Sequence, residues 1–138
     1  MLSEHIGNEY SLLIGGSPKS VNARSRKSKR NLKAYKTRIR KEASKIFHNP
    51  INGKVNVSIY HFHKGTTIDL GNISKPIMDS LIGIAYEDDG QAEDITLRRI
   101  NLGNPRKIEN VTSSLIPEAL ARKKECIVIV INQINEER

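Results

Sequence analysis

The chain has 138 residues, a formal net charge of +8 and one cysteine. This length suffices for an ordinary hydrophobic core, so we expect one domain over residues 1–138. The lone Cys126 excludes an internal disulfide, and its place in an apolar run predicts a small buried side chain. That run, residues 126–131, is far shorter than the roughly 20 residues of a membrane-spanning helix. We therefore expect no membrane partner and a cytoplasmic protein.

The positive charge is concentrated in one segment. Residues 19–45 contain twelve Lys or Arg and one acid, which gives this segment a charge of +11 and the rest of the chain −3. Such a surplus favours a polyanion, and nucleic acid before a membrane surface. Aromatic residues are scarce, which favours recognition of backbone shape over stacking on single strands. The predicted DNA-contacting side chains are Arg24, Arg26, Lys27, Lys29, Arg30, Lys33, Lys36 and Arg40.

The first half of the chain predicts a strand, a helix and a second strand. The first strand covers residues 10–14 and ends at a glycine pair, and a polar, basic loop follows at residues 17–27. Apolar residues then recur every three or four positions from Leu32 to Ile46, which predicts a helix that stops near His48. Alternating apolar and polar residues predict the next strand at residues 54–63.

The second half begins with another helix, in which apolar residues repeat at positions 73, 77 and 81. Pro76 is expected near its start, with Asn72 or Ser74 as N-cap. A strand at residues 95–102 would carry Arg98 and Arg99 on its exposed face. A short helix at 114–123 and a strand at 125–134 complete the chain. This order predicts an α/β (mixed α+β) domain, a small mixed sheet with helices packed on it.

Acidic residues gather at one place in this basic chain, because residues 87–94 contain five of them. A solvated turn is one explanation. The other involves Asp69, at the mouth of the second helix, which meets Asp89 if the chain doubles back at Gly83. Convergent carboxylates repel each other without a cation, and Mg²⁺, with Mn²⁺ as a substitute, is a hard ion that prefers oxygen ligands. If Asp88 and Asp89 lie on a strand, one of them faces the site.

Lys75 follows Asn72 by three residues and precedes Asp79 by four, so the three occupy adjacent helical positions. A lysine there can stabilise charge on a reacting phosphate, and it can equally form a plain surface ion pair with Asp79. His61 and His63 share a strand face but lack a third ligand at suitable spacing, so we expect ordinary strand residues.

These residues resemble the signature of the RusA-type Holliday junction resolvases. The family's pattern is Asp-x-Asp-Asn, a lysine three residues later, an aspartate four further on, and then Asp-Asp-x-Gln. The family also has an opening strand, a loop with Pro and Asn, here Pro18 and Asn22, and a basic segment before its second strand. The signature residues of this chain are Asp69, Gly71, Asn72, Lys75, Asp79, Asp88, Asp89 and Gln91.

The resemblance implies a homodimeric, Mg²⁺-dependent endonuclease that nicks four-way DNA junctions in recombination and repair, and that is often encoded by prophages. It implies that Asp69 and Asp89 hold the metal, with Asp88 or Asp79 supporting them, and that Lys75 is the essential lysine. The second aspartate of the family's Asp-x-Asp-Asn motif corresponds to position 71, where this chain has Gly71.

Two interpretations of Gly71 compete. In one, the chain is a disabled nuclease that still binds branched DNA. In the other, Asp88 or Glu87 substitutes as a ligand with weaker metal binding. Loss of a carboxylate ligand damages such chemistry, so we expect impaired activity. The rival functions are a non-catalytic branched-DNA-binding protein on the same scaffold and a general basic nucleic-acid binder.

Overall fold

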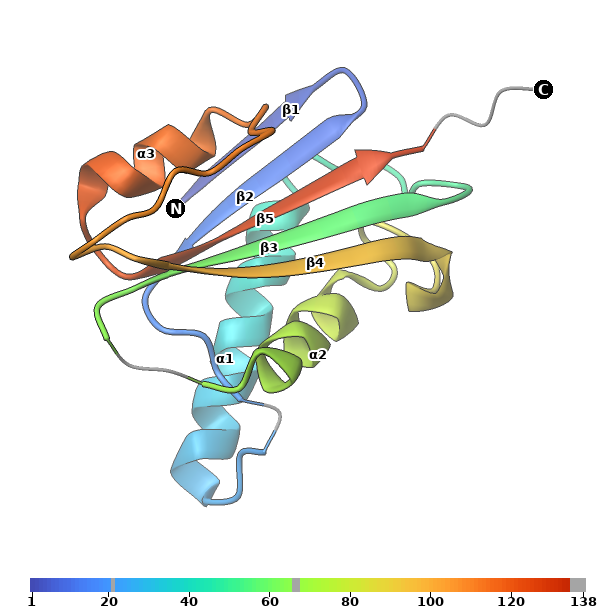
Figure 1. Ribbon diagram of the computed structural model, residues 1–138. Helices are drawn as coiled ribbons and strands as arrows, with labels where there is room; N and C mark the ends of the chain where they lie inside the picture. Colours follow the sequence, from blue (N-terminus) through green and yellow to red (C-terminus); the bar gives the residue numbers. More distant parts are fainter. Residues whose placement is uncertain (21, 66–67, 135–138) are drawn as a thin grey trace.

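The computed structural model describes residues 1–20, 22–65 and 68–134 (Figure 1). Within these residues one sheet has five strands in the order β1-β2-β5-β3-β4. The strands are β1 (Leu2–Ile6), β2 (Glu9–Gly15), β3 (Val55–His63), β4 (Ala92–Asn101) and β5 (Cys126–Gln133). The helices are α1 (Arg26–Ala43), α2 (Leu70–Leu81), α3 (Leu115–Arg122) and a 3₁₀ turn, η1 (Asp89–Gln91).

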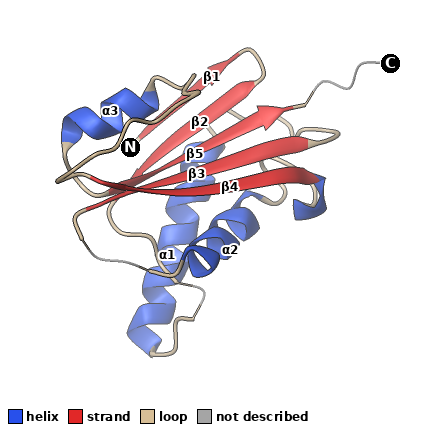
Figure 2. Ribbon diagram, in the orientation of Figure 1, coloured by secondary structure: helices blue, strands red, loops and turns tan. Residues whose placement is uncertain are grey.

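The sheet is mixed, because β3 and β4 run parallel while the other neighbouring strands are antiparallel. The helices α1 and α2 cover one face and α3 lies on the other (Figures 1 and 2). The predicted mixed sheet with helices packed on it is confirmed. The crossover from β3 to β4 through α2 gives the parallel pair its connection, and this crossover carries the signature residues.

The alternation of β3 divides its side chains between two apolar cores. Val57 and Ile59 pack with Tyr35 and Ile39 of α1, and these four residues are at most 1% exposed. Phe62, on the other face, joins the smaller core beneath α3. The larger core therefore fixes α1 and α2 against the same face of the sheet.

α1 begins with a capping box. The Oγ of Ser25 accepts a hydrogen bond from the N–H of Ser28 at 3.0 Å, and the hydroxyl of Ser28 accepts one from the N–H of Ser25. The helix ends at Ala43, so the predicted end near His48 is wrong. The N–H of Ile46 bonds the carbonyl three residues back, at Ala43. The chain therefore tightens into turns, although its apolar spacing continues.

α2 starts earlier than the sequence predicted. Asp69 is its N-cap and Leu70 its first residue, which replaces the expected caps Asn72 and Ser74. Pro76 lies inside the helix, where it has no N–H to donate to the carbonyl of Asn72. The cap formed by Asp69 and the burial of the apolar face sustain the helix through this missing bond.

Three further differences concern the strands. β1 was not predicted, although Gly7-Asn8 is a two-residue hairpin signal and Gly7 has a φ of +59°. Asp88 is the N-cap of η1 and Asp89 is its first residue, so neither lies on a strand. Arg99 does not share an exposed face with Arg98, since its side chain reaches the carbonyl of Ile68 in the segment that enters α2.

Candidate acidic site and basic groove

Asp69 is held at the N-terminus of α2 by backbone contacts. Its Oδ1 accepts a hydrogen bond from the N–H of Gly71 at 3.2 Å, which satisfies one of the donors that a helix leaves unpaired in its first turn. The positive end of the helix dipole also favours a carboxylate here. Asp69 is exposed, so its carboxylate is accessible to a ligand from solvent.

Gly71 occupies the second position of α2 without a conformational need for glycine, because its backbone is not left-handed. Among the described residues, a Cβ at this position would approach only the Oδ1 of Asp69, at 3.9 Å. That distance is an ordinary van der Waals contact, so an aspartate fits at position 71. Its carboxylate would stand beside that of Asp69, which is the arrangement that a shared cation requires.

Lys75 and Asp79 form the predicted i, i+4 pair, with 3.7 Å between Nζ and Oδ2. The side chain of Lys75 is 63% exposed and that of Asp79 is 33% exposed, so solvent screens the pair and its contribution to stability is small. Asn72 lies one turn earlier on the helix and is half-buried. The ammonium of Lys75 therefore remains accessible to a phosphate group.

Gln91 fixes the acidic turn that follows α2. Its Oε1 accepts hydrogen bonds from the N–H groups of Glu87 and Asp88 at 2.8 and 3.1 Å. Its Nε2 donates to two carbonyls of the loop before β3, at 2.8 and 2.7 Å. Asp88 caps η1, and both Asp88 and Asp89 are exposed. The spacing Asp-Asp-x-Gln thus has a structural reason, since the glutamine holds the backbone that presents the two carboxylates.

Tyr86 connects this turn to α2. Its ring is fully buried, and its hydroxyl donates a hydrogen bond to the carbonyl of Met78 at 2.8 Å. Burial, and then the charges of Asp89 and Asp79, raise the pKa of the Tyr86 phenol. The hydrogen bond sets Tyr86 beside the residue that precedes Asp79, and Asp89 follows Tyr86 by three residues, so Asp79 and Asp89 lie in the same part of the molecule.

Asp69 and Asp89, however, lie at opposite ends of α2. Asp69 follows Ile68, whose carbonyl is bound by Arg99 near the end of β4, whereas Asp89 lies just before β4 begins at Ala92. A helix of twelve residues, roughly 18 Å long, separates the two positions. Within the described residues of one chain, no three His, Cys, Asp or Glu side chains gather closely enough to hold a metal ion. The donor types suit Mg²⁺, but one copy of the chain does not bring its acidic ends together.

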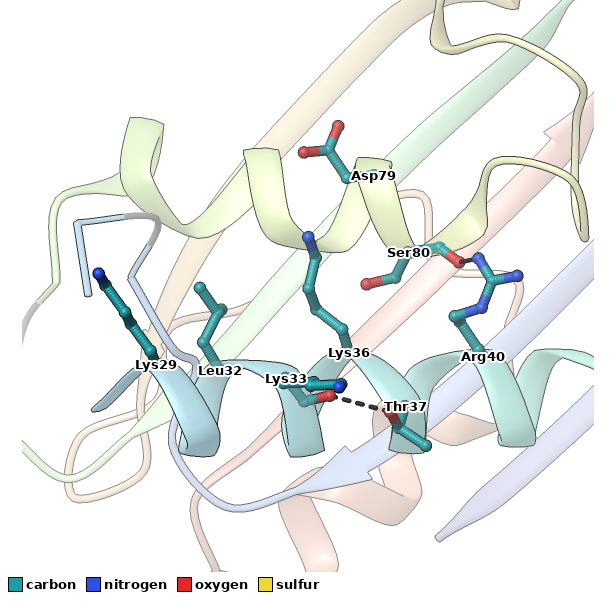
Figure 3. A pocket seen from close by; sticks show the side chains of 8 residues that line it. All are labelled: Lys29, Leu32, Lys33, Lys36, Thr37, Arg40, Asp79 and Ser80. Carbon is teal, nitrogen blue, oxygen red and sulfur yellow. Dashed lines mark hydrogen bonds between the residues drawn. The ribbon is translucent and has the colours of Figure 1, made fainter. Parts of the chain in front are cut away.

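A groove of about 400 Å³ runs between α1 and α2 (Figure 3). Lys36 extends from α1 toward α2, and Asp79 stands on the α2 side. The lining contains four cationic side chains and one carboxylate, and that carboxylate points away from α1. This excess of positive charge suits a phosphate backbone. The lining residues are Lys29, Leu32, Lys33, Lys36, Thr37, Arg40, Asp79 and Ser80.

The model of one protein family, endodeoxyribonuclease RusA, matches residues 16–109, which is more than half of the chain. The chain belongs to this family. No curated protein matches the chain. The RusA match contains α1, α2, η1 and β4, so the basic groove and the acidic residues fall inside it, and the predicted family is confirmed. No helix in the described part of the chain is long and apolar enough to cross a membrane.

The other predicted DNA-contacting residues of this RusA domain lie along α1 and the loop before it. Arg24, Arg26, Lys27 and Arg30 are exposed. Arg40 has an additional role that charge counting did not indicate. Its Nη1 donates to the carbonyls of Ser80 and Ile82 at 3.0 and 3.3 Å. These carbonyls lie at the C-terminus of α2, where a cation is favourable, so Arg40 positions α2 against α1.

His61 belongs to a polar network at the far end of β3. Its Nε2–H donates to Glu125 at 2.8 Å, and the hydroxyl of Ser17 donates to the same carboxylate at 2.6 Å. Burial lowers the pKa of His61 in spite of Glu125, and its Nδ1 is buried without a partner among the described residues. Burial alone would raise the pKa of Glu125, but the Ser17 and His61 hydrogen bonds outweigh it and lower that pKa. A neutral imidazole therefore ties the start of the basic loop to the sheet.

Proposed function

We propose that this protein is a Mg²⁺-dependent endonuclease that nicks four-way DNA junctions in recombination and repair, and that it acts as a homodimer. The groove between α1 and α2 carries the proposal, because three lysines of the basic helix line it beside the helix that bears the signature residues. RusA membership supports a nuclease. Since the substrate would be chromosomal or phage DNA, we expect the protein in the bacterial cytoplasm, at the nucleoid.

The residues divide into binding and chemical roles. The exposed cations of the loop and α1 would contact phosphates, which fixes the position of the DNA without reading its sequence. Lys75, exposed one turn after Asn72, would stabilise charge on the scissile phosphate. Asp69 of one copy and Asp89 of the other would hold Mg²⁺ with support from Asp88, because the two aspartates lie at opposite ends of α2 within one chain. The ion would supply polarisation of the phosphodiester and activation of the attacking water.

Gly71 sets the level of activity in this proposal. An aspartate at this position would add a ligand beside Asp69, and the structure has room for it. With glycine there, the metal loses a carboxylate, so we expect weak metal binding and slow cleavage. The alternative function, a branched-DNA-binding protein that does not cut, is favoured by this same substitution.

The test is cleavage of a synthetic four-way junction with Mg²⁺, alongside a linear duplex of the same sequence. We expect Gly71→Asp to raise junction cleavage at least about a hundredfold, because even the outer partners of metal ligands affect activity 10–100-fold. Gly71→Ala is the matched control. It removes the same helix-weakening glycine, worth roughly 0.5–1 kcal/mol, but adds no ligand, so it should leave cleavage unchanged.

The outcomes separate the candidate functions. Junction binding without cutting, unaffected by Gly71→Asp, would support the non-catalytic protein and refute a disabled metal site. Equal cleavage of duplex and junction would refute selectivity for branched DNA. Equal affinity for junction and duplex without cleavage would identify a general nucleic-acid binder.

A further inference from the structure

Three rings from separate parts of the chain form a continuous stack near the end of α1. The ring centroid of His5 in β1 lies 3.9 Å from that of Tyr10 in β2, and Tyr10 lies 4.2 Å from Phe47. The rings are nearly parallel, with interplanar angles of 14° and 18°. Phe47 is buried, Tyr10 is half-buried and His5 is exposed. The stack therefore leads from the larger core out to solvent.

His5 is the outer end of this stack. β1 is an edge strand of the sheet, so the stack ends at the sheet edge. The Nε2–H of His5 donates a hydrogen bond to the carbonyl of Gly7 at 2.8 Å, which fixes the orientation of the imidazole. The ring face turned away from Tyr10 is therefore accessible, and its position is set before a ligand arrives. Aromatic side chains presented in this way bind unpaired bases by stacking.

A second groove, the β1 groove, adjoins the stack on the flank of α1 that faces β1. The side chain of Leu2 packs beneath α3, so the alternate residues Met1 and His5 point to the α1 side. Met1 lines the groove, and His5 lies roughly 13 Å further along the strand. Lys45, at the other wall, precedes Phe47 of the stack by two residues. The β1 groove has a volume of about 320 Å³ and is lined by Met1, Arg38, Lys41, Glu42 and Lys45.

The β1 groove is positively charged in spite of its one carboxylate. Glu42 is 5% exposed and is paired with Lys45, with 3.1 Å between Nζ and Oε1, so these two charges offset each other. Arg38 donates to the carbonyl of Gly15 at 3.2 Å, which holds its guanidinium in place, and Lys41 is exposed. The charges of Arg38 and Lys41 are therefore available to a phosphate backbone.

α1 thus carries cations on two flanks. The groove toward α2 and the β1 groove share no lining residue. His5 and Tyr10 also precede residues 16–109, which match the RusA model, so the ring stack is an addition to the matched domain. The small number of aromatic residues did not indicate such a stack, because its three rings come from β1, β2 and the turn after α1.

We propose that the β1 groove binds single-stranded DNA, with an unpaired base stacked on His5 and the phosphates beside Arg38 and Lys41. A base within a duplex is already stacked between its neighbours, so the ring of His5 selects unpaired strands. A positive groove that follows the backbone, together with a ring for the bases, is the combination that single strands require. This binding site is separate from the groove between α1 and α2 and does not rest on the proposed nuclease function.

Fluorescence anisotropy with a labelled oligothymidylate tests the stack. His5→Ala should weaken binding of this oligonucleotide about tenfold, because that is the order of the contribution of one stacked base. The affinity for a linear duplex should not change. His5→Phe is the matched control, since it keeps a flat ring at an exposed position and should retain the wild-type affinity. Circular dichroism melts establish that each variant is folded.

Lys41→Gln tests the groove itself. The slope of log affinity against log salt for the oligothymidylate should fall by about 0.7, the contribution of one phosphate contact on a single strand. Lys124→Gln removes the same charge from an exposed position before β5 and should leave the slope unchanged. Equal losses in the two variants would mean that net charge, and not the β1 groove, binds the strand, which would overturn the proposal.

Photo-cross-linking tests the position of the base. An oligothymidylate with one 5-iododeoxyuridine should cross-link on irradiation to the peptide that contains His5, identified by mass spectrometry. Cross-links confined to the groove between α1 and α2 would overturn the proposal. So would an unchanged oligothymidylate affinity in His5→Ala, or an equal loss of duplex affinity in that variant.

An acidic protein segment is the rival occupant of a positive groove. If an oligoglutamate peptide bound as tightly as the oligothymidylate and lost this affinity in Lys41→Gln, the rival would be supported and the proposal would fail. None of these measurements uses DNA cleavage or a four-way junction. Failure of the proposed nuclease function is therefore distinguishable from failure of the single-strand site.

Discussion

α1 and the segment from α2 to η1 use charge in opposite ways. The cations of α1 are spread over eighteen residues, and most of them are exposed and make no hydrogen bond in the described structure. The carboxylates are few, and Asp69 and Asp88 are each held by a backbone N–H, at 3.2 Å. A binding surface built from many similar charges tolerates the loss of one, because contributions to phosphate binding add. A site for a single ion does not, because each ligand has its own position.

The largest expected effect concerns the acidic residues. In the Gly71→Asp background, Asp69→Asn and Asp89→Asn should each lower Mg²⁺-dependent junction cleavage at least about a hundredfold, since each removes a charged ligand. Asparagine still caps a helix, so Asp69→Asn retains the fold. If each site takes Asp69 from one copy and Asp89 from the other, mixing the two inactive variants restores cleavage. One site of each mixed dimer then has both aspartates.

Exchange of subunits between the two preparations must be shown by the same mixing with labelled chains. Asp69→Asn mixed with a second preparation of itself serves as the control and should stay inactive. Exchange without recovered cleavage would mean that Asp69 and Asp89 act within one chain, and would contradict a metal site shared between two copies.

A smaller and graded effect is expected on the basic side of the comparison. Lys29→Gln with Lys33→Gln should reduce the slope of log affinity against log salt by about 1.8 for junction DNA, because each phosphate contact contributes roughly 0.9. Both residues line the groove between α1 and α2. Lys123→Gln with Lys124→Gln removes the same charge from exposed positions outside the RusA match and should leave the slope unchanged. Equal losses for the two double variants would show that net charge alone drives binding.

The two regions also differ in what their sequence reveals. Charge counting and the apolar spacing sufficed to predict α1 as an exposed basic helix. For the acidic residues, the spacing predicted that they belong to a family signature, but it did not predict where they lie relative to one another in the fold. The chain does reverse at Gly83, which has a φ of +83°, yet the turn that follows is fixed near Tyr86 by contacts of Gln91. Those long-range contacts leave Asp89 at the far end of α2 from Asp69.

Some positioning residues gave no local signal at all. Arg40 looked like one more cation of the basic segment, but its guanidinium binds carbonyls at the C-terminus of α2. Arg99 looked exposed because it adjoins Arg98, although neighbouring residues of a strand face opposite sides. Both assignments depend on which element packs across the strand or helix, and periodicity does not contain that information. Pro76 was expected near the start of its helix but lies inside α2, because tertiary packing sustains the helix through the missing hydrogen bond.

The smallest expected effect lies outside both charged regions, in the network of His61, Glu125 and Ser17. The pKa of His61 is lowered in the folded protein from about 6.5 in the unfolded chain. At a pH between the folded and the unfolded pKa of His61, the unfolded chain binds a proton that the folded protein does not. The contribution of His61 to the free energy of unfolding is therefore complete above about pH 6.5 and is lost as the pH falls through that value. The melting temperature should therefore fall from pH 7.5 to pH 5.5.

His61→Gln should flatten this dependence, because an amide can still donate to Glu125 but does not titrate. The interval stops at pH 5.5 because the pKa of Glu125 is also lowered, and its contribution is lost only at more acidic pH. His48→Gln, at an exposed position, is the matched control and should retain the wild-type slope. His63 and Arg99 also face the imidazole. A slope that persists in His61→Gln would exclude His61 as its source and would mean that the His61–Glu125 bond fixes the basic loop independently of pH.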